Sequence, residues 1–287
     1  MALVTVPTRG AALLRIRRAG KGVSDQIQWL GGLVIFTGKI VVSVPSVLRR
    51  YLREVLRLLT DVTFGGRLLA VTASTTAVLI ILSAAVGIEI GVEGVQGLQV
   101  IGLAPLAGFL AGFGDTREIA PLITAFGIAA QLGCRFTAQI GAMRISEEID
   151  ALEVMGIPSL SYLITTRVIA ALIAVIPLYL ISLAGAYFCT EQAVSLFAHV
   201  GTGTYRYYFH SILTPRDVVF STVKVIVFVV LITVIHTYYG YTAGGGPEGV
   251  GRATGRAIRA SIVTLAITDM LMTLLFWGTS PGIHITG

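Results

Sequence analysis

Residues 168–190 read VIAALIAVIPLYLISLAGAYFCT, a run of 23 residues without a charged side chain. A helix rises about 1.5 Å per residue, so roughly 20 apolar residues cross the ~30 Å hydrocarbon layer of a bilayer. The run is continuously apolar and does not alternate as the strands of a membrane barrel do. It therefore predicts a transmembrane helix.

The rest of the chain has the same character. Its 287 residues are 55% hydrophobic and 13% charged, and the mean hydropathy of +0.85 is far above that of a soluble globular domain. Residues 68–88 form a second run, 21 residues long, without a charge. We therefore predict an all-α polytopic membrane protein with an N-terminal interfacial helix and five transmembrane helices.

The basic residues are concentrated at the start, since eleven of the 21 precede Leu68. Next to membrane spans, such a segment indicates the cytoplasmic side and anionic headgroups rather than nucleic acid. Residues 27–48 are interrupted by Lys39, Pro45 and glycines, which favours a helix lying in the headgroup plane over a span. We divide the chain into a cytoplasmic basic tail with this helix, residues 1–66, and a transmembrane domain, residues 67–287.

Residues 95–134 leave two topologies open, because the polar DTRE at 115–118 separates two apolar runs. They could be two crossings, or one crossing with a re-entrant or broken helix. One net crossing keeps Arg135 and Arg144 cytoplasmic and agrees with the positive-inside tendency. With spans at 168–190, about 218–241 and about 262–277, five crossings place the N-terminus in the cytoplasm and the C-terminus outside. The expected cytoplasmic loop before the last span carries Arg252, Arg256 and Arg259.

Residues 141–156 read GAMRISEEIDALEVMG and hold four of the fifteen acidic residues of the chain. Ser146 as N-cap, with Gly156 and Pro158 as a stop signal, predicts a helix of about nine residues, too short to span. A solvated acidic loop and a docking helix are both compatible with this composition. The docking helix is favoured because one face is apolar, with Ile145, Ile149 and Leu152, and the other carries Glu147 and Asp150.

Few other residues suggest chemistry. No lysine lies in a G-x-x-x-x-G-K-[ST] loop, so any ATP must be bound by another chain. No catalytic or metal-ligating arrangement is found, and we expect no enzyme and no metal. His236 and Asp269 lie within predicted spans, where a proton relay and a hydrogen-bonded packing role are both open. Gly251 and Gly255 form a small-xxx-small pair, which predicts close helix packing.

Three segments carry a resemblance to a known family: TREIAPLITAFGIAAQLGCRFTAQIGAMR at 116–144, GAMRISEEIDALEVMGI at 141–157, and HTYYGYTAGGGPEGVGRATGRAIRAS at 236–261. Together they resemble the MlaE/YrbE family, the permease subunits of ABC transporters that work with MCE-domain proteins. The likeness covers about residues 67–277. The third segment looks most like the B-type YrbE subunits of actinobacterial Mce systems.

The resemblance implies a coupling helix between the second and third spans, seated in a groove of an ABC ATPase that binds ATP and Mg. Carried over, the ATPase contacts would be Arg144, Glu147, Glu148, Asp150 and Glu153, and the residues holding the helix to the permease would be Ile145, Ile149 and Leu152. It also implies a second permease subunit, an A-type paralogue, with a lipid pocket between the two that opens toward a hexamer of MCE proteins. Candidate lining residues are Leu79, Leu82 and Met270.

The leading hypothesis is a plasma-membrane permease subunit that moves a fatty acid, sterol or phospholipid. A proton-driven secondary transporter using Asp269 and His236 is the second hypothesis, and a membrane scaffold that transports nothing is the third. The lack of inverted repeats and of further charges within the spans favours the first over the second.

Overall fold

The computed structural model describes residues 9–64, 75–197 and 200–278, with side chains in the first helix from residue 28 onward. Within these ranges all the regular structure is helical, as the apolar runs predict. The elements are α1 (Arg9–Arg50), α2 (Leu52–Phe64), α4 (Thr75–Glu89), η1 (Ile90–Gly94), α5 (Val95–Val100), η2 (Ala104–Leu106), α6 (Ala107–Leu110), η3 (Ala111–Ile119), α7 (Ala120–Ile128), η4 (Ala129–Gly133), α8 (Cys134–Ile145), α9 (Glu148–Val154), η5 (Leu160–Thr165), α10 (Thr166–Phe197), α11 (Thr202–Ile212), α12 (Pro215–Tyr241) and α13 (Gly246–Trp277).

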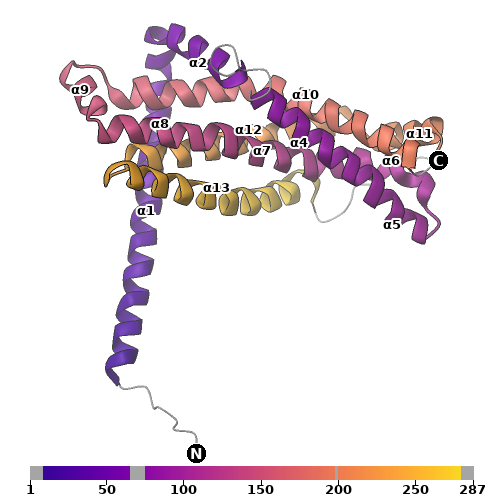
Figure 1. Ribbon diagram of the computed structural model, residues 1–287, viewed down its shortest axis with the longest axis horizontal. Helices are drawn as coiled ribbons and strands as arrows, with labels where there is room; N and C mark the ends of the chain where they lie inside the picture. The colour runs from indigo at the N-terminus through magenta and orange to yellow at the C-terminus, as the bar shows by residue number, and fades with distance from the viewer. Residues whose placement is uncertain (1–8, 65–74, 198–199, 279–287) are drawn as a thin grey trace, which may run out of the picture.

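Six described segments are long and apolar enough to cross a membrane: Gln28–Arg50, Thr75–Val100, Ala104–Ile145, Leu160–Phe197, Pro215–Tyr241 and Gly246–Trp277. The last five run along the long axis of the molecule, whereas α1 lies across them (Figure 1). A helix that lies across five spans follows the plane of the membrane. The arrangement therefore agrees with an interfacial first helix and five crossings, although length and composition alone would allow α1 to span.

The first two spans meet in a short turn. The helical path from Thr75 continues through η1 and α5 to Val100, and a second path runs from Ala104 to Ile145. The polar residues at 115–118 lie inside this second path, in the wide turns of the π-helix η3. One helix thus joins the turn at 101–103 to α9, which agrees with one net crossing between the first span and the acidic segment.

The last span is longer than its sequence pattern indicates. It begins at Gly246, so the expected loop is confined to residues 242–245, and Arg252, Arg256 and Arg259 lie on the helix itself. Gly245 has a φ of +85°, a conformation that glycine adopts readily, and a proline follows at the start of α13. Polar and glycine residues hid this helical start from a search for apolar runs.

Small residues set the helix packing, but not the pair that the sequence suggested. A Cβ at Gly251 would meet nothing within 4 Å, so close packing of this pair within the chain is wrong. Gly87 and Gly91 instead bring the first span onto α10, where a Cβ at Gly87 would lie 2.5 Å from the Ala186 carbonyl oxygen. Close backbone approach of this kind is the main source of helix association in lipid.

Candidate functional site

The acidic segment forms a short surface helix at one end of the bundle, at the left of Figure 1. The helix α9 has seven residues and begins at Glu148, so the prediction that Ser146 is its N-cap is wrong. Ser146 is the residue that ends α8, and its hydroxyl has two acceptors within reach, the Ala142 carbonyl at 3.0 Å and Glu148 Oε1 at 2.9 Å. Glu147 adopts a left-handed conformation with φ 62°, which turns the chain sharply between α8 and α9.

The apolar side of this segment packs on the same chain. Ile149 is fully buried in a cluster with Ile140, Leu163 and Ile164, and Leu152 is packed against that cluster. Ile145 packs against a separate cluster that contains Val250. The structure thus places all three residues of the predicted apolar face against the helical bundle of the same chain.

The five residues proposed to contact an ATPase divide into two groups. Arg144 and Asp150 pair with each other at 2.6 Å, with side chains 38% and 55% exposed, and Glu153 Oε1 accepts hydrogen bonds from Ser159 Oγ at 2.6 Å and Tyr241 Oη at 3.3 Å. Glu147 and Glu148 are exposed. Only Glu147 of the five has neither an ion pair nor a side-chain hydrogen bond within the described part of the chain.

Two apolar residues that the sequence analysis did not single out complete the exposed side of α9. Val154 is 89% exposed and Met155 is 65% exposed, at the C-terminal end of the helix. They follow the predicted apolar face in sequence but point away from the core. Exposed apolar side chains rimmed by charges are typical of a surface that binds another protein.

A buried charge network lies farther along the bundle, on the way to its opposite end. Lys224 of α12 is fully buried, and its Nζ lies 2.6 Å from Asp269 Oδ1 of α13 and 3.0 Å from Glu118 Oε2 of η3. The same ammonium donates to Thr273 Oγ1 at 2.8 Å and to the Arg117 carbonyl at 2.9 Å. One lysine therefore joins three helices and two carboxylates.

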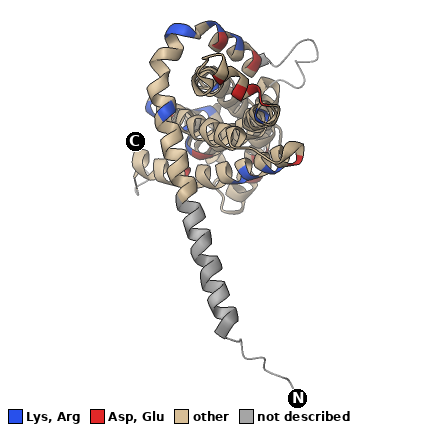
Figure 2. Cartoon of the chain, turned by 90° about the vertical axis from the view of Figure 1, so that its left-hand side faces the viewer, with Lys and Arg blue, Asp and Glu red and all other residues tan. Residues whose placement is uncertain are grey.

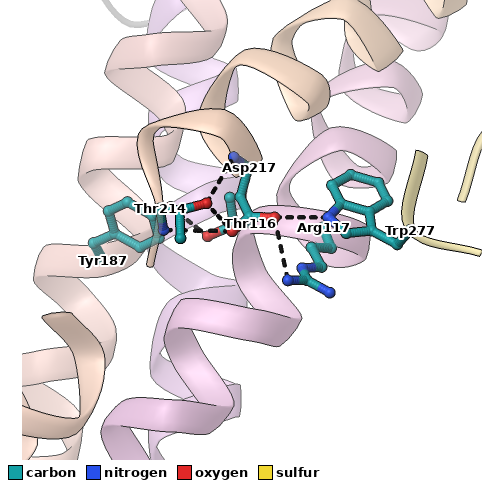
Figure 3. Close-up of polar contacts among 6 residues, drawn as sticks. All are labelled: Thr116, Arg117, Tyr187, Thr214, Asp217 and Trp277. Atoms are coloured by element: carbon teal, nitrogen blue, oxygen red, sulfur yellow. Dashed lines mark hydrogen bonds and ion pairs between the residues drawn. The ribbon is translucent and has the colours of Figure 1, made fainter. Parts of the chain in front are cut away.

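A second cluster surrounds Asp217, in the first turn of α12 (Figure 3). Arg117 Nη2 lies 3.2 Å from Asp217 Oδ1, to which Trp277 Nε1 also donates at 2.6 Å. Thr214 forms a capping box with Asp217, which satisfies the first amides of α12. Beside it, the hydroxyls of Thr116 and Tyr187 are hydrogen-bonded, which ties η3 to α10.

These charges correct one argument from the sequence, that further charges are lacking within the spans. Asp115, Arg117, Arg167 and Lys224 are all buried in the helical bundle in addition to Asp269. Arg167 and Lys224 each stand alone beside or within an apolar run, and Asp115 and Arg117 belong to the polar group at 115–118, so neither pattern indicates a buried network by itself. An isolated lysine within an apolar span, such as Lys224, is the signal that could have revealed the network.

His236 and Asp269 do not form one site. His236 is fully buried against Gly133, and its Nδ1 lies 2.9 Å from Thr137 Oγ1 and its Nε2 lies 3.3 Å from Ser261 Oγ. Ser261 and Asp269 are eight residues apart on α13, or about 12 Å at ~1.5 Å per residue. The two residues proposed as a proton relay therefore have separate partners.

The candidate lipid-lining residues differ in their exposure. Leu79 is 1% exposed and packs in the core against Gly127, whereas Leu82 and Met270 are 37% and 59% exposed on α4 and α13. Groups of His, Cys, Asp and Glu that could hold a metal ion are not found among the described residues.

The comparisons with known proteins cover most of this architecture. Residues 64–275 match the family described as Permease MlaE. The protein TRIGALACTOSYLDIACYLGLYCEROL 1, chloroplastic, of Arabidopsis thaliana is 29% identical over 204 residues, which are 70% of this chain and 57% of that protein. A probable ABC transporter permease protein of Rickettsia bellii is 35% identical over 167 residues, 56% of this chain and 62% of the relative.

A further probable ABC transporter permease protein, from a Synechocystis species, is 29% identical over 209 residues, 71% of this chain and 78% of its own length. The chain spans about three fifths of the length of the Arabidopsis and Rickettsia relatives. The family match runs from the last residue of α2 to the last turn of α13, and it takes in α9 and the buried charge network. The chain therefore belongs to the MlaE permease family.

Proposed function

We propose that this chain is the permease subunit of an MCE-type ABC transporter that moves a hydrophobic lipid across or out of the plasma membrane. Family membership supports a permease, and two of the relatives are named as probable ABC transporter permeases. Another relative carries the lipid trigalactosyldiacylglycerol in its name. A fatty acid, a sterol and a phospholipid all fit the apolar surfaces of the spans.

The proposed assembly has several chains. The sequence contains no Walker A loop, so an ABC ATPase subunit would bind ATP and Mg. In this proposal the chain is a B-type YrbE subunit that pairs with an A-type paralogue, and the pair opens toward a hexamer of MCE proteins. Nucleic acid has no role in it.

The observation that carries the proposal is the attachment of α9. Glu153 holds the helix to Ser159, at the start of the third span, and to Tyr241, at the end of the fourth. A displacement of α9 would therefore pull on two spans at once. Four exposed residues of the segment, Glu147, Glu148, Val154 and Met155, would provide the contact with the ATPase.

The charge distribution supports a cytoplasmic position for this end of the bundle. Figure 2 looks onto the end that carries α9 and shows basic segments on several of its helices. Arg144, Arg252, Arg256 and Arg259 all lie at this end. Positive residues at the ends of spans favour the cytoplasmic side, and with five crossings this supports our proposal that the N-terminus lies inside and the C-terminus outside.

Two spans have faces that the chain itself leaves uncovered. The most apolar windows of the first and last spans are 28% and 22% buried, against 50–56% for the other three long spans. Leu82 and Met270 lie on these exposed helices. The faces suit a second permease subunit with a lipid pocket between the two, and Leu79 belongs to the core behind that pocket.

Charge reversal on α9 tests the proposal. Glu147→Lys and Glu148→Lys together should abolish ATP-dependent lipid transfer between vesicles by the purified complex, while the permease still folds into the membrane. Asp150 is left unchanged because it pairs with Arg144. Purification in mild detergent, with mass spectrometry of the chains and lipids that accompany it, provides the second test. A chain that carries no ATPase, or transfer that survives the reversal, would refute the coupling role.

The secondary-transporter alternative makes a different prediction. It requires lipid transfer driven by a proton gradient in vesicles that contain this chain alone, and loss of transfer in Asp269→Asn. Asp269 faces Lys224 rather than His236, so the carboxylate is neutralised by a buried cation and has no relay to the imidazole. A scaffold would instead assemble the complex and leave lipid transfer unaffected when the pocket is blocked.

A further inference from the structure

A groove lies between α1, α12 and α13 at the same end of the bundle as α9. It has a volume of about 620 Å³ and is lined by Trp29, Leu30, Tyr239, Arg256, Arg259, Ala260, Val263 and Thr264. Trp29 and Tyr239 form its aromatic wall, with ring centroids 6.2 Å apart, and Arg256 Cζ lies 5.9 Å from the centre of the Tyr239 ring. The groove thus combines an apolar floor with a cationic edge.

The arginines at this edge have no acidic partner in the part of the chain that the structure describes. Within the described residues, neither Arg256 nor Arg259 forms an ion pair, and the lining of the groove contains no acid. The neighbouring Arg252 differs, since its Nη1 lies 3.6 Å from Glu248 Oε1. Two adjacent unpaired cations beside an apolar groove form a site that attracts a monovalent or divalent anion.

The depth of the arginines in the membrane matches the headgroup layer. The last 20 residues of α13, residues 258–277, cover about 30 Å at ~1.5 Å per residue, which is the hydrocarbon thickness. Arg259 then lies at the boundary of the hydrocarbon, and Arg256 lies one turn farther into the headgroups. Val263 and Leu30 lie beside the acyl chains, and the ring of Trp29 suits the interface.

A second hollow continues from the arginines toward the aqueous side. It has a volume of about 790 Å³ and shares Arg256 and Arg259 with the groove. Gly251 and Gly255 also line it, as do Glu248 and Arg252, which pair with each other at 3.6 Å, and a side chain at Gly251 would meet no atom within 4 Å. The small residues that do not pack helices therefore leave open space beside the two cations.

We propose that this groove holds one anionic phospholipid as a resident lipid, with its phosphate between Arg256 and Arg259, an acyl chain along Leu30 and Val263, and its headgroup in the glycine-lined hollow. Basic pockets between spans on the cytoplasmic side bind anionic headgroups in this manner. A second copy of the chain fits less well, because a two-fold axis through the groove would bring these arginines close to their own copies. The lipid would brace the interfacial helix α1 against α13.

Native mass spectrometry of the full chain in detergent tests the site, with phosphatidylglycerol, phosphatidylcholine and inorganic phosphate as separate probes. We expect tighter binding of one phosphatidylglycerol than of phosphatidylcholine, and a loss of about tenfold or more in Arg256→Gln/Arg259→Gln. Arg144→Gln is the control, since it removes an arginine at the same end of the bundle that is already paired with Asp150 and lines neither hollow. Leu30→Ser, at a side chain that is 52% exposed, should weaken the binding of phosphatidylglycerol without affecting the binding of inorganic phosphate.

Three outcomes would overturn the proposal. Equal binding of the two lipids would show that charge does not select the occupant. Displacement of phosphatidylglycerol by millimolar inorganic phosphate, with no effect of Leu30→Ser, would show a simple anion site. Crosslinking between Arg256→Cys residues of two copies in the membrane would show that the groove is an interface between chains.

Discussion

Replacement of Glu153 by alanine tests whether α9 is fastened to the spans as the structure shows. The carboxylate accepts from Ser159 Oγ at 2.6 Å and from Tyr241 Oη at 3.3 Å, and these are its side-chain contacts within the described residues. A hydrogen bond to a charged group contributes about 1.5–3 kcal/mol when it is well shielded. Glu153 is exposed to solvent, so we reduce the sum of the two bonds to about 1–2 kcal/mol.

That loss should make local opening of α9 more frequent by a factor of roughly 5–30. Hydrogen exchange measured by mass spectrometry on a peptide covering residues 148–157 reads this opening directly, because the Ala151 and Met155 amides are bonded within α9. We expect exchange there to accelerate by the same factor in Glu153→Ala. Exchange in α12 should change much less, since the packing of that helix does not depend on Glu153.

Two further variants distinguish the fastening from general damage. Tyr241→Phe removes the longer of the two hydrogen bonds to Glu153, together with the 3.1 Å contact between Tyr241 Oη and Ser159 Oγ, and leaves the ring beside Arg144. Because the 2.6 Å bond from Ser159 to Glu153 remains, it should accelerate exchange by less than Glu153→Ala. Glu147→Gln removes a carboxylate that forms no ion pair or side-chain hydrogen bond within the described residues, so it should leave hydrogen exchange in α9 unchanged. Unaltered exchange in Glu153→Ala, or equal acceleration in all three variants, would refute the fastening role.

Three other perturbations test separate features. Lys224→Met should lower the free energy of unfolding by about 3–5 kcal/mol, because Glu118 and Asp269 lose their buried cation. The double variant Lys224→Met/Asp269→Asn should recover part of this loss of stability. Titration with a denaturing detergent measures the free energy of unfolding of both proteins. Gly87→Leu should drive the first span away from α10 and lower the thermal unfolding temperature, whereas Gly185→Leu, in open space on α10, should leave it unchanged. Val154→Asp should weaken ATPase binding in a pull-down assay without altering thermal stability.

The spans could be predicted from the sequence because the bilayer leaves little choice. An apolar run of some twenty residues has to satisfy its backbone hydrogen bonds internally, so the runs at 68–88, 168–190 and about 218–241 predict spans. The structure has spans at 75–100, 160–197 and 215–241, and residues 68–74 of the first run lie outside the described residues. The ends of the spans could not be predicted in this way, because the last span extends from the predicted Ile262 back to Gly246 through a stretch rich in arginine and glycine. Hydropathy detects where a helix meets lipid, whereas the helix itself continues into the headgroups.

The acidic segment shows how far local patterns reach. Periodicity placed Ile149 and Leu152 on one face, and the structure packs that face on the permease. The cap was wrong, because Ser146 could equally end one helix or begin the next, and the choice depends on the left-handed turn at Glu147. Partners such as Ser159 and Tyr241 could not be predicted, since they come from segments that only the folded bundle brings together.

The contacts of α12 bear on how a signal from α9 would travel. One end of this 27-residue helix holds α9 through Tyr241, and the other end is fixed by the capping box and by Arg117 and Trp277 around Asp217. Lys224 adds a buried ion pair to α13 near the fixed end. A displacement imposed at Tyr241 therefore meets a helix anchored about 40 Å away at ~1.5 Å per residue. We expect such a helix to pivot near Lys224, so motion of α9 would displace the end of α12 close to α1 most and the end close to Trp277 least.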